Sequence, residues 1–469
     1  MADNRDIGLM AHLMRRAGFG APREELERRV AKGYDATVDE LIQASGSPPA
    51  DEYVLLRYQP AALLPGGNPP MGNVNWMFHL VNTQRPLEEK MALFWHHVFA
   101  TGNSKVDNYD QLLAQIAMFR QRGMGSYREL LLALAKDPAM IYWLDNNENH
   151  KDAVNENWGR ELLELFSMGQ GNYTEKDVRE ASRAFTGWTF SVKIPRLPYG
   201  RFPWEFEYVA EDHDNGEKGF LGRTGNFNGE DIIDIIVRQP ACGRFIARHL
   251  YNFFVADEPQ VPSWKIMPPR DEAAVDALAN AFRESGFEMK AVLNTLFKSD
   301  FFKDAYYSKV KSPAELVVGT LRLVGGAEIP RPDYGRDVAM QPTYMGQDLL
   351  NPPSVEGWHT GKEWINSGSL MSRINFVADM VGNTELPGVQ NLVTRVRAKG
   401  ALDPEAFVDC CLDLMGPLEV GTDTRQELLQ QAREGGPVTW NSDHEVQNST
   451  GRIGEMLQLI VAMREYQFN

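Results

Sequence analysis

Apolar residues recur every three or four positions over most of this chain, which is the spacing of helices with one buried face. Proline and acidic residues open several of these stretches, as at Pro86, and glycine closes others, as at Gly169. Thr174 and Ser126 stand where N-caps are expected, the latter with Glu129 three residues on. The pattern predicts helices over residues 7–45, 74–144, 157–168, 174–188, 229–256, 271–299, 308–325, 369–399, 404–415, 422–433 and 450–465.

Residues 188–229 break this periodicity. Aromatic and polar residues alternate there and turn residues cluster, which predicts a small β-hairpin. Residues 45–73 and 326–368 are rich in proline and glycine and are predicted to be long irregular segments. The expected fold class is therefore mainly α, a large multi-helix globular fold with a small β-hairpin insert around 188–229. We expect a main helical domain over 1–400, with the helices of 401–469 packing on it.

Composition narrows the class of protein. The 469 residues are 43% hydrophobic and carry a net charge of −16, which disfavours nucleic acid and anionic membranes as partners. The three cysteines have no zinc-type spacing and are read as free thiols. No run of 18 apolar residues occurs and the first residues carry no export signal. We therefore expect a cytoplasmic location as the chain is written, and export only if a signal was removed.

Several long motifs occur in a characteristic order over roughly residues 8–380. They read HLMRRAGFGAP, KMALFWHHVFATGNSKV, LAKDPAMIYWLDNNEN, NENWGRELLELFSMGQGNYTEKDVREASRAFTGW, HDNGEKGFLGRTG and PPSVEGWHTGKEWIN. In these motifs the chain resembles the bacterial DUF1800 family, whose activity is not established. The resemblance implies a helical fold, frequent export, and a sulfatase-like protein encoded nearby as a partner. Relatives often read W-H-x-H-F, but Val98 stands here at the second histidine place, so a two-histidine metal site cannot be carried over to it.

A calcium-like loop is predicted between two helices at residues 145–156. Oxygen-bearing side chains stand at positions 1, 3, 5 and 12 of an EF-hand spacing, namely Asp145, Asn147, Asn149 and Glu156. Lys151 at position 7 would contribute its backbone carbonyl. Alternate residues of a tight loop point inward, and a glutamate on the following helix supplies two oxygens, so the pattern favours calcium as a cofactor.

Two features of this loop argue against a standard EF-hand. His150 stands where glycine is usual, and Asp152 where an apolar residue is expected. Because only two carboxylates stand at ligand positions, the expected dissociation constant for calcium is about 10⁻⁴–10⁻³ M. The alternative is a solvated helix connection in which Asn155 or Asn157 caps the next helix.

Further candidate residues lie on predicted helices. His96 stands in an apolar helix, while Glu161 and Glu164 are one turn apart on one face of another. Carboxylates and a histidine on facing helices can build a polar site. The alternative is a buried ion-pair network of Glu161 or Glu164 with Arg179 or Arg183.

His213 lies in the predicted hairpin beside Asp214 and near Lys218. These groups suit acid–base chemistry, and the alternative is a turn stabilised by Asp214. Trp358 and Trp364 lie on a proline- and glycine-punctuated segment, where they either pack or hold a flat ligand such as a sugar.

Two hypotheses of function follow from these candidates. The first is a calcium-binding, hydrolase-like enzyme whose cleft is lined by His96, Glu161, Glu164 and His213. The second is a non-catalytic partner or maturation factor of a sulfatase-like enzyme, and a plain structural protein is a third reading. The motifs of serine hydrolases, zincins, P-loop proteins and dinucleotide-binding proteins are absent from the sequence.

Overall fold

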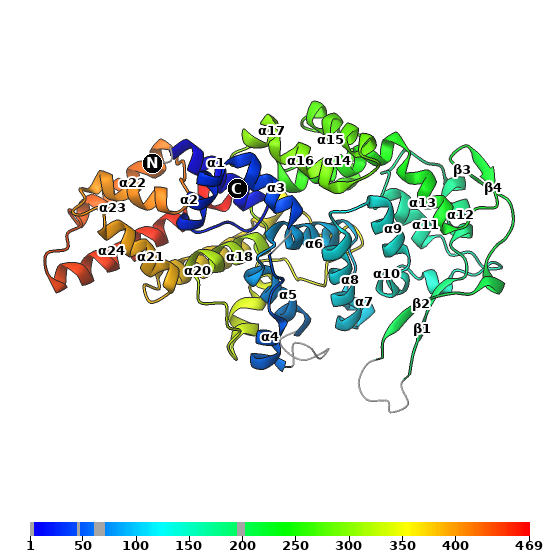
Figure 1. Cartoon of the computed structure of the whole chain (residues 1–469), viewed down its shortest axis with the longest axis horizontal. Helices are drawn as coiled ribbons and strands as arrows, with labels where there is room; N and C mark the ends of the chain where they lie inside the picture. The colour runs from blue at the N-terminus through cyan, green and yellow to red at the C-terminus, as the bar shows by residue number, and fades with distance from the viewer. Residues whose placement is uncertain (1–3, 45–46, 61–70, 195–201) are drawn as a thin grey trace.

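The computed structural model describes residues 4–44, 47–60, 71–194 and 202–469, and most of them are helical, as predicted (Figure 1). The N-terminal helices are α1 (Asn4–Arg16), α2 (Arg23–Lys32) and α3 (Tyr34–Gln43). A short helix, α4 (Glu52–Tyr58), then lies inside the segment predicted to be irregular. The Asp51 side chain accepts a hydrogen bond from the Tyr53 backbone N–H at 3.0 Å and so caps this helix, a signal that the surrounding prolines obscured.

Helix α6 forms the centre of the molecule. The helices of this region are α5 (Met71–Asn82), α6 (Pro86–Val98), α7 (Asn103–Val106), α8 (Tyr109–Arg122), α9 (Tyr127–Ala135) and α10 (Pro138–Trp143). Every residue of α6 except Glu88 is buried, including His96 and His97 at its carboxyl end. A helix that is buried all round must lie inside the packing of its neighbours, and Figure 1 shows α6 in the middle of the chain.

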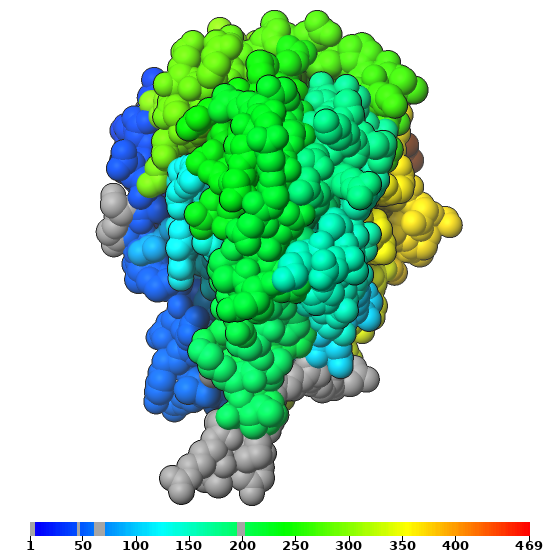
Figure 2. All heavy atoms as spheres, turned by 90° about the vertical axis from the view of Figure 1, so that its right-hand side faces the viewer, coloured from blue at the N-terminus to red at the C-terminus, as the bar shows by residue number. Residues whose placement is uncertain are grey.

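The β insert consists of two separate antiparallel pairs. Strand β1 (Trp188–Val192) pairs with β2 (Trp204–Tyr208), and β3 (Lys218–Phe220) pairs with β4 (Arg223–Gly225). They follow α11 (Asn157–Glu164) and α12 (Glu175–Ala184), with the short 3₁₀ turns η2 (Asn146–Glu148) and η3 (Ala210–Asp212) nearby. All of these lie at one end of the molecule, which faces the viewer in Figure 2. The predicted insert is confirmed.

A second group of helices covers the central ones. It comprises α13 (Gly229–Val237), α14 (Pro240–Phe254), the 3₁₀ turn η4 (Val261–Lys265), α15 (Glu272–Glu284), α16 (Met289–Lys298) and α17 (Asp300–Lys303). Helices α14 and α15 pack against each other, and α15 packs on α16. The predicted single stretch 229–256 is divided at Pro240, because proline lacks the N–H that would continue the helix.

The remaining helices form the opposite end. They are α18 (Pro313–Val324), the π-helical turn η5 (Gly335–Ala339), α19 (Gln341–Tyr344), η6 (Gly361–Trp364), α20 (Ser367–Gly382), α21 (Pro387–Arg397), α22 (Pro404–Leu414), α23 (Thr422–Glu434), α24 (Asp443–Ala462) and η7 (Glu465–Gln467). Helix α24 packs against α20, and α22 against both α23 and α24. After α24 the chain returns towards α18, where the Asn469 N–H donates to the Lys309 carbonyl at 2.8 Å.

Two predicted helix caps have different outcomes. Thr174 forms a capping box with Asp177, as expected. Ser126 occupies the N-cap position, as predicted, but its side chain makes no capping hydrogen bond. The backbone at Ser126 pairs instead with that at Glu288, because the Phe287 carbonyl accepts the Tyr127 N–H at 2.9 Å. A backbone contact with a segment distant in sequence therefore stands where a local side-chain cap was expected.

One large apolar core runs through the molecule, and Val310, Trp358 and Trp364 form a smaller cluster beside it. The three cysteines are free, and Cys242 and Cys411 are buried. Among the residues that the structure describes, no helix has both the length and the apolar character needed to cross a membrane.

Candidate functional site

The side chains of the predicted calcium loop turn to several different partners. Asp145 lies in the left-handed region with φ 57°, and its Oδ1 accepts a hydrogen bond from the Lys105 Nζ at 2.7 Å. The Asn147 amide donates to Glu148 at 2.9 Å. Glu156 contacts Arg160 at 3.4 Å, one turn further along α11. The carboxylates of Asp145 and Glu156 thus have cationic protein partners, whereas the Asn147 Oδ1 is buried without a hydrogen-bond partner.

Asn149 is the buried member of this loop. Its Nδ2 donates to the Ser182 carbonyl at 2.9 Å, and its Oδ1 accepts the Asn155 N–H at 3.0 Å. Asn155 in turn accepts the Asn157 N–H at 3.0 Å, which is the helix-capping alternative considered from the sequence. Lys151 donates to the Glu211 carbonyl at 2.6 Å. Within the described ranges no group of three or more histidine, cysteine, aspartate or glutamate side chains is arranged to hold a metal, and calcium binding stays a prediction.

His96 is enclosed between two tryptophans. Its ring centroid lies 5.2 Å from that of Trp76 and 5.4 Å from that of Trp358, edge-on to both. The side chain is fully buried, and neither ring nitrogen has a hydrogen-bond partner. Burial lowers its pKa to about 3, with a smaller contribution from His97, so the imidazole is neutral at pH 7.

His97 forms the contact between α6 and the segment 351–364. Its ring stacks on Trp358 with centroids 6.2 Å apart, and Gly357 lies directly against the His97 backbone. Burial lowers the pKa of His97 to about 4, assisted by the charge of Lys309. His249 of α14, whose pKa burial also lowers, packs between Phe245 and Trp264, with centroids 4.6 Å from each.

Glu161 carries the most strongly perturbed carboxyl among the predicted site residues. The side chain is half-buried on α11, one turn before Glu164. Burial raises its pKa to about 7, the negative charges of Glu164 and Glu356 add to this, and Arg160 opposes it. Glu164 accepts hydrogen bonds from the Tyr173 hydroxyl at 3.0 Å and from Gln170.

His213 lies in another part of the structure, beside the β1–β2 pair. Its Nδ1 donates to the Thr186 carbonyl at 2.9 Å, and its ring contacts Tyr208. The neighbouring Lys218 Nζ donates to the Asp214 carbonyl. These contacts correspond to the turn-stabilising alternative.

The predicted ion-pair network has different members. Arg183 binds Asp214 at 2.7 Å and Glu180 at 2.9 Å, whereas Glu164 accepts hydrogen bonds from Gln170 and Tyr173. The partners proposed from the sequence were wrong because Asp214 comes from the β region, 31 residues away along the chain.

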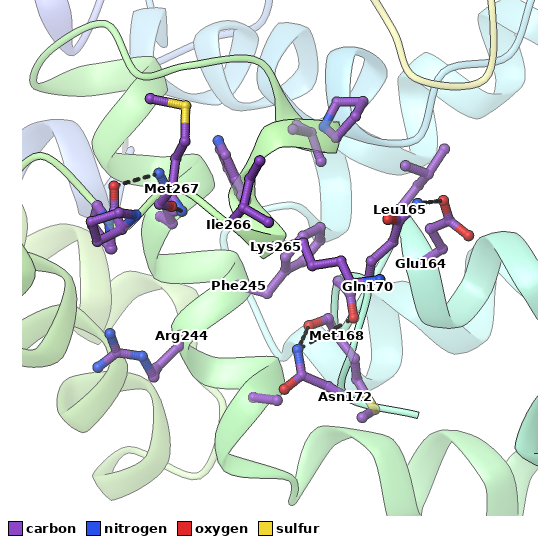
Figure 3. Close-up of a pocket in the computed structure, with 18 of the residues that line it drawn as sticks. Glu164, Leu165, Met168, Gln170, Asn172, Arg244, Phe245, Lys265, Ile266 and Met267 are labelled. Atoms are coloured by element: carbon purple, nitrogen blue, oxygen red, sulfur yellow. Dashed lines mark hydrogen bonds between the residues drawn. The ribbon is translucent and has the colours of Figure 1, made fainter. Parts of the chain in front are cut away.

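A pocket of about 360 Å³ begins at Glu164 (Figure 3). Its walls come from the end of α11 and the turn after it, from one face of α14, and from η4 with the residues following it. Of the predicted site residues, Glu164 lines this pocket and Glu161 lies one turn away. Sequence reasoning missed Phe245, Arg248 and Trp264, although the segment VPSWKIMPPR, with its tryptophan among prolines, was a signal that could have indicated an ordered wall.

His97 stacks on Trp358, and electrostatic interactions link His97 with His249 and Glu356 with Glu161. Glu164 lines the pocket and Glu161 lies one turn before it on α11, whereas His96 packs between Trp76 and Trp358 and His213 lies beside the β1–β2 pair. Of the four cleft residues of the first hypothesis, Glu164 alone lines this pocket, and a catalytic role for them stays a prediction.

A family model described as "Protein of unknown function (DUF1800)" matches residues 12–468, which is nearly the whole chain. No curated protein and no solved structure matches the chain.

Proposed function

The chain belongs to the DUF1800 family of proteins of unknown function, and we propose that it is a hydrolase-like enzyme in which Glu161 and Glu164 perform acid–base chemistry. The observation that carries this proposal is the Glu161 carboxyl, which is half-buried and has its pKa raised to about 7. A carboxyl that titrates near neutrality exchanges protons efficiently at physiological pH.

The two carboxyls have different environments, which supports different roles. Burial and the acidic neighbours of Glu161 disfavour the ionised form of its carboxyl. Glu161 therefore holds a proton up to about pH 7. Glu164 accepts hydrogen bonds from the Tyr173 hydroxyl and from Gln170, which hold its carboxyl in place. In the proposed division of roles, protonated Glu161 is the acid and Glu164 is the base.

The proposed reaction is hydrolysis with both carboxyls returned to their starting states. Glu164, acting as the base, takes a proton from a water molecule as the water oxygen bonds to the electrophilic atom of the substrate. Glu161 gives its proton to the leaving oxygen as the bond to that oxygen breaks. Proton transfer from Glu164 to Glu161, directly or through solvent, restores the site.

The test is a substrate panel of phosphate, sulfate and carboxylate esters and glycosides, together with metal analysis of the purified protein. Glu161→Gln keeps the size of the side chain and removes its proton, so we expect kcat to fall by about 10²–10⁴-fold. Because the protonated form is the donor, the rate of the wild type should decline as pH rises through about 7.

Glu284→Gln is the matched control, since Glu284 is exposed on α15. It should leave kcat and the pH profile unchanged. Equal activity of the wild type and Glu161→Gln, or a wild type inactive on the whole panel, would count against the proposal.

A second candidate function is a non-catalytic partner of a sulfatase-like enzyme. The observation that favours it is the exposure of Ile266 and Met267 at the mouth of the pocket, 83% and 45% respectively. Exposed apolar side chains grouped together are typical of protein-binding surfaces. Size-exclusion chromatography with the sulfatase-like protein encoded nearby separates the two functions, because Ile266→Asp should abolish a complex, whereas Glu161→Gln should leave the complex intact.

A further inference from the structure

The pocket beside Glu164 has mostly apolar walls. Along α14 the lining residues Ala241, Arg244, Phe245 and Arg248 follow helical spacing, so a single face of that helix borders it. Leu165 and Met168 form the facing wall, and Trp264 closes the third side. Figure 3 shows these segments surrounding one space. Most of the surface offered to a ligand is therefore apolar.

The two arginines of these walls are already engaged, and Lys265, which also lines the pocket, is exposed. Arg248 binds Glu258 at 2.7 Å and donates to the carbonyls of Met267 and Pro268 at 2.9 and 3.0 Å. Arg244 forms an ion pair with Asp276. Because these guanidinium groups have protein partners, they fix the walls rather than offering a charge to a ligand.

Trp264 is held in place on two sides. Its Nε1 donates to the Pro259 carbonyl at 2.7 Å, and the Arg248 guanidinium lies 4.5 Å from its ring centroid. An aromatic wall that is fixed before a ligand arrives loses little conformational entropy on binding. The exposed Ile266 and Met267 next to it would gain burial when an apolar ligand fills the space.

We propose that this pocket binds a neutral aromatic or alkyl group of the substrate, next to the bond that Glu161 and Glu164 act on. This inference rests on the proposed function for the position of the reacting bond. The volume of about 360 Å³ exceeds the roughly 150 Å³ apolar cavity that holds benzene, so a two-ring group fits. The substrate class is thus an ester or glycoside with an uncharged, apolar leaving or acyl group.

The test uses 1-naphthol as a neutral probe, with binding followed by quenching of tryptophan fluorescence and by saturation-transfer NMR. Ala241→Trp introduces a large side chain from the α14 wall and should weaken 1-naphthol binding at least tenfold. Ala273→Trp is the matched control, because Ala273 is exposed on α15 and is not a lining residue, and it should bind like the wild type. Melting temperatures of both variants show that they fold.

The outcomes separate this inference from the proposed function. Equal binding by Ala241→Trp and the wild type, or no binding by the wild type, would overturn the pocket assignment, whatever the activity. Binding that is lost in Ala241→Trp, but kept in Glu161→Gln, supports the pocket even if no substrate of the panel is cleaved. Where aryl substrates are cleaved, Ala241→Trp should raise the KM for 1-naphthyl esters at least tenfold more than it raises the KM for methyl esters.

Discussion

Gly357 is the residue that allows the segment 351–364 to approach α6. Its φ is 82°, and a Cβ there would lie 2.3 Å from the His97 carbonyl oxygen and 2.9 Å from its Nδ1. Both the backbone conformation and the available space therefore require glycine. This single position sets the stacking of Trp358 on His97 and the closeness of Glu356 to Glu161, so it affects the pKa that the proposed reaction uses.

Gly357→Ala should lower the free energy of unfolding by about 2–4 kcal/mol, because the strain of positive φ and the clash with His97 add together. Gly222→Ala is the control: its φ is 77°, but nothing lies within 4 Å of the position of a Cβ. It should cost only about 1 kcal/mol. Urea unfolding of both variants measures the difference, and equal losses would show that the contact with His97 is not tight.

At the scale of elements, the connection between α10 and α11 is organised by hydrogen bonds from within the protein. Asn149 ties the connection to α12 through Ser182, while Lys105 of α7 binds Asp145. An ion entering this connection has to compete with Lys105 for the Asp145 carboxylate. Local spacing indicated which oxygens are close in sequence, but packing against α7 and α12 decided where they point.

Calcium at millimolar concentration should therefore raise the melting temperature of Lys105→Met more than that of the wild type, because this variant frees Asp145. Glu156→Gln removes one of the two predicted ligand carboxylates and should show no shift. Thermal unfolding with calcium, with magnesium as the comparison ion, measures this. Identical melting temperatures with and without calcium in all three proteins would remove calcium as a cofactor.

At the scale of the whole molecule, a buried ion pair joins three regions that are distant in sequence. Lys90 of α6 binds Glu315 of α18 at 2.5 Å and donates to the Gly18 carbonyl after α1 at 2.9 Å. Burial lowers the pKa of Lys90 to about 8, and the charges of Lys309 and Lys90 hold that of Glu315 below its usual range against the effect of burial. The pair fixes α6, and with it His96 and His97, relative to the rest of the fold.

Glu315→Gln should destabilise the protein by about 3–5 kcal/mol, because it leaves Lys90 and Lys309 buried without their anion. The exposed pair of Lys136 and Glu230 provides the control, and Glu230→Gln should cost at most about 1 kcal/mol. Chemical denaturation at pH 7 measures both. A loss in Glu315→Gln no larger than that in Glu230→Gln would contradict this account of the pair.

The sequence by itself determined the helical class, the β insert and the capping of α12 by Thr174, because periodicity and capping act within a few residues. It also indicated Glu161 and Glu164, whose shared face follows from helical geometry. Only the tertiary structure decided that His213 lies apart from them, that Arg183 binds Asp214, and that α14 and η4 complete the pocket. Those contacts join segments tens of residues apart, and burial and charge at such junctions depend on packing that no local pattern encodes.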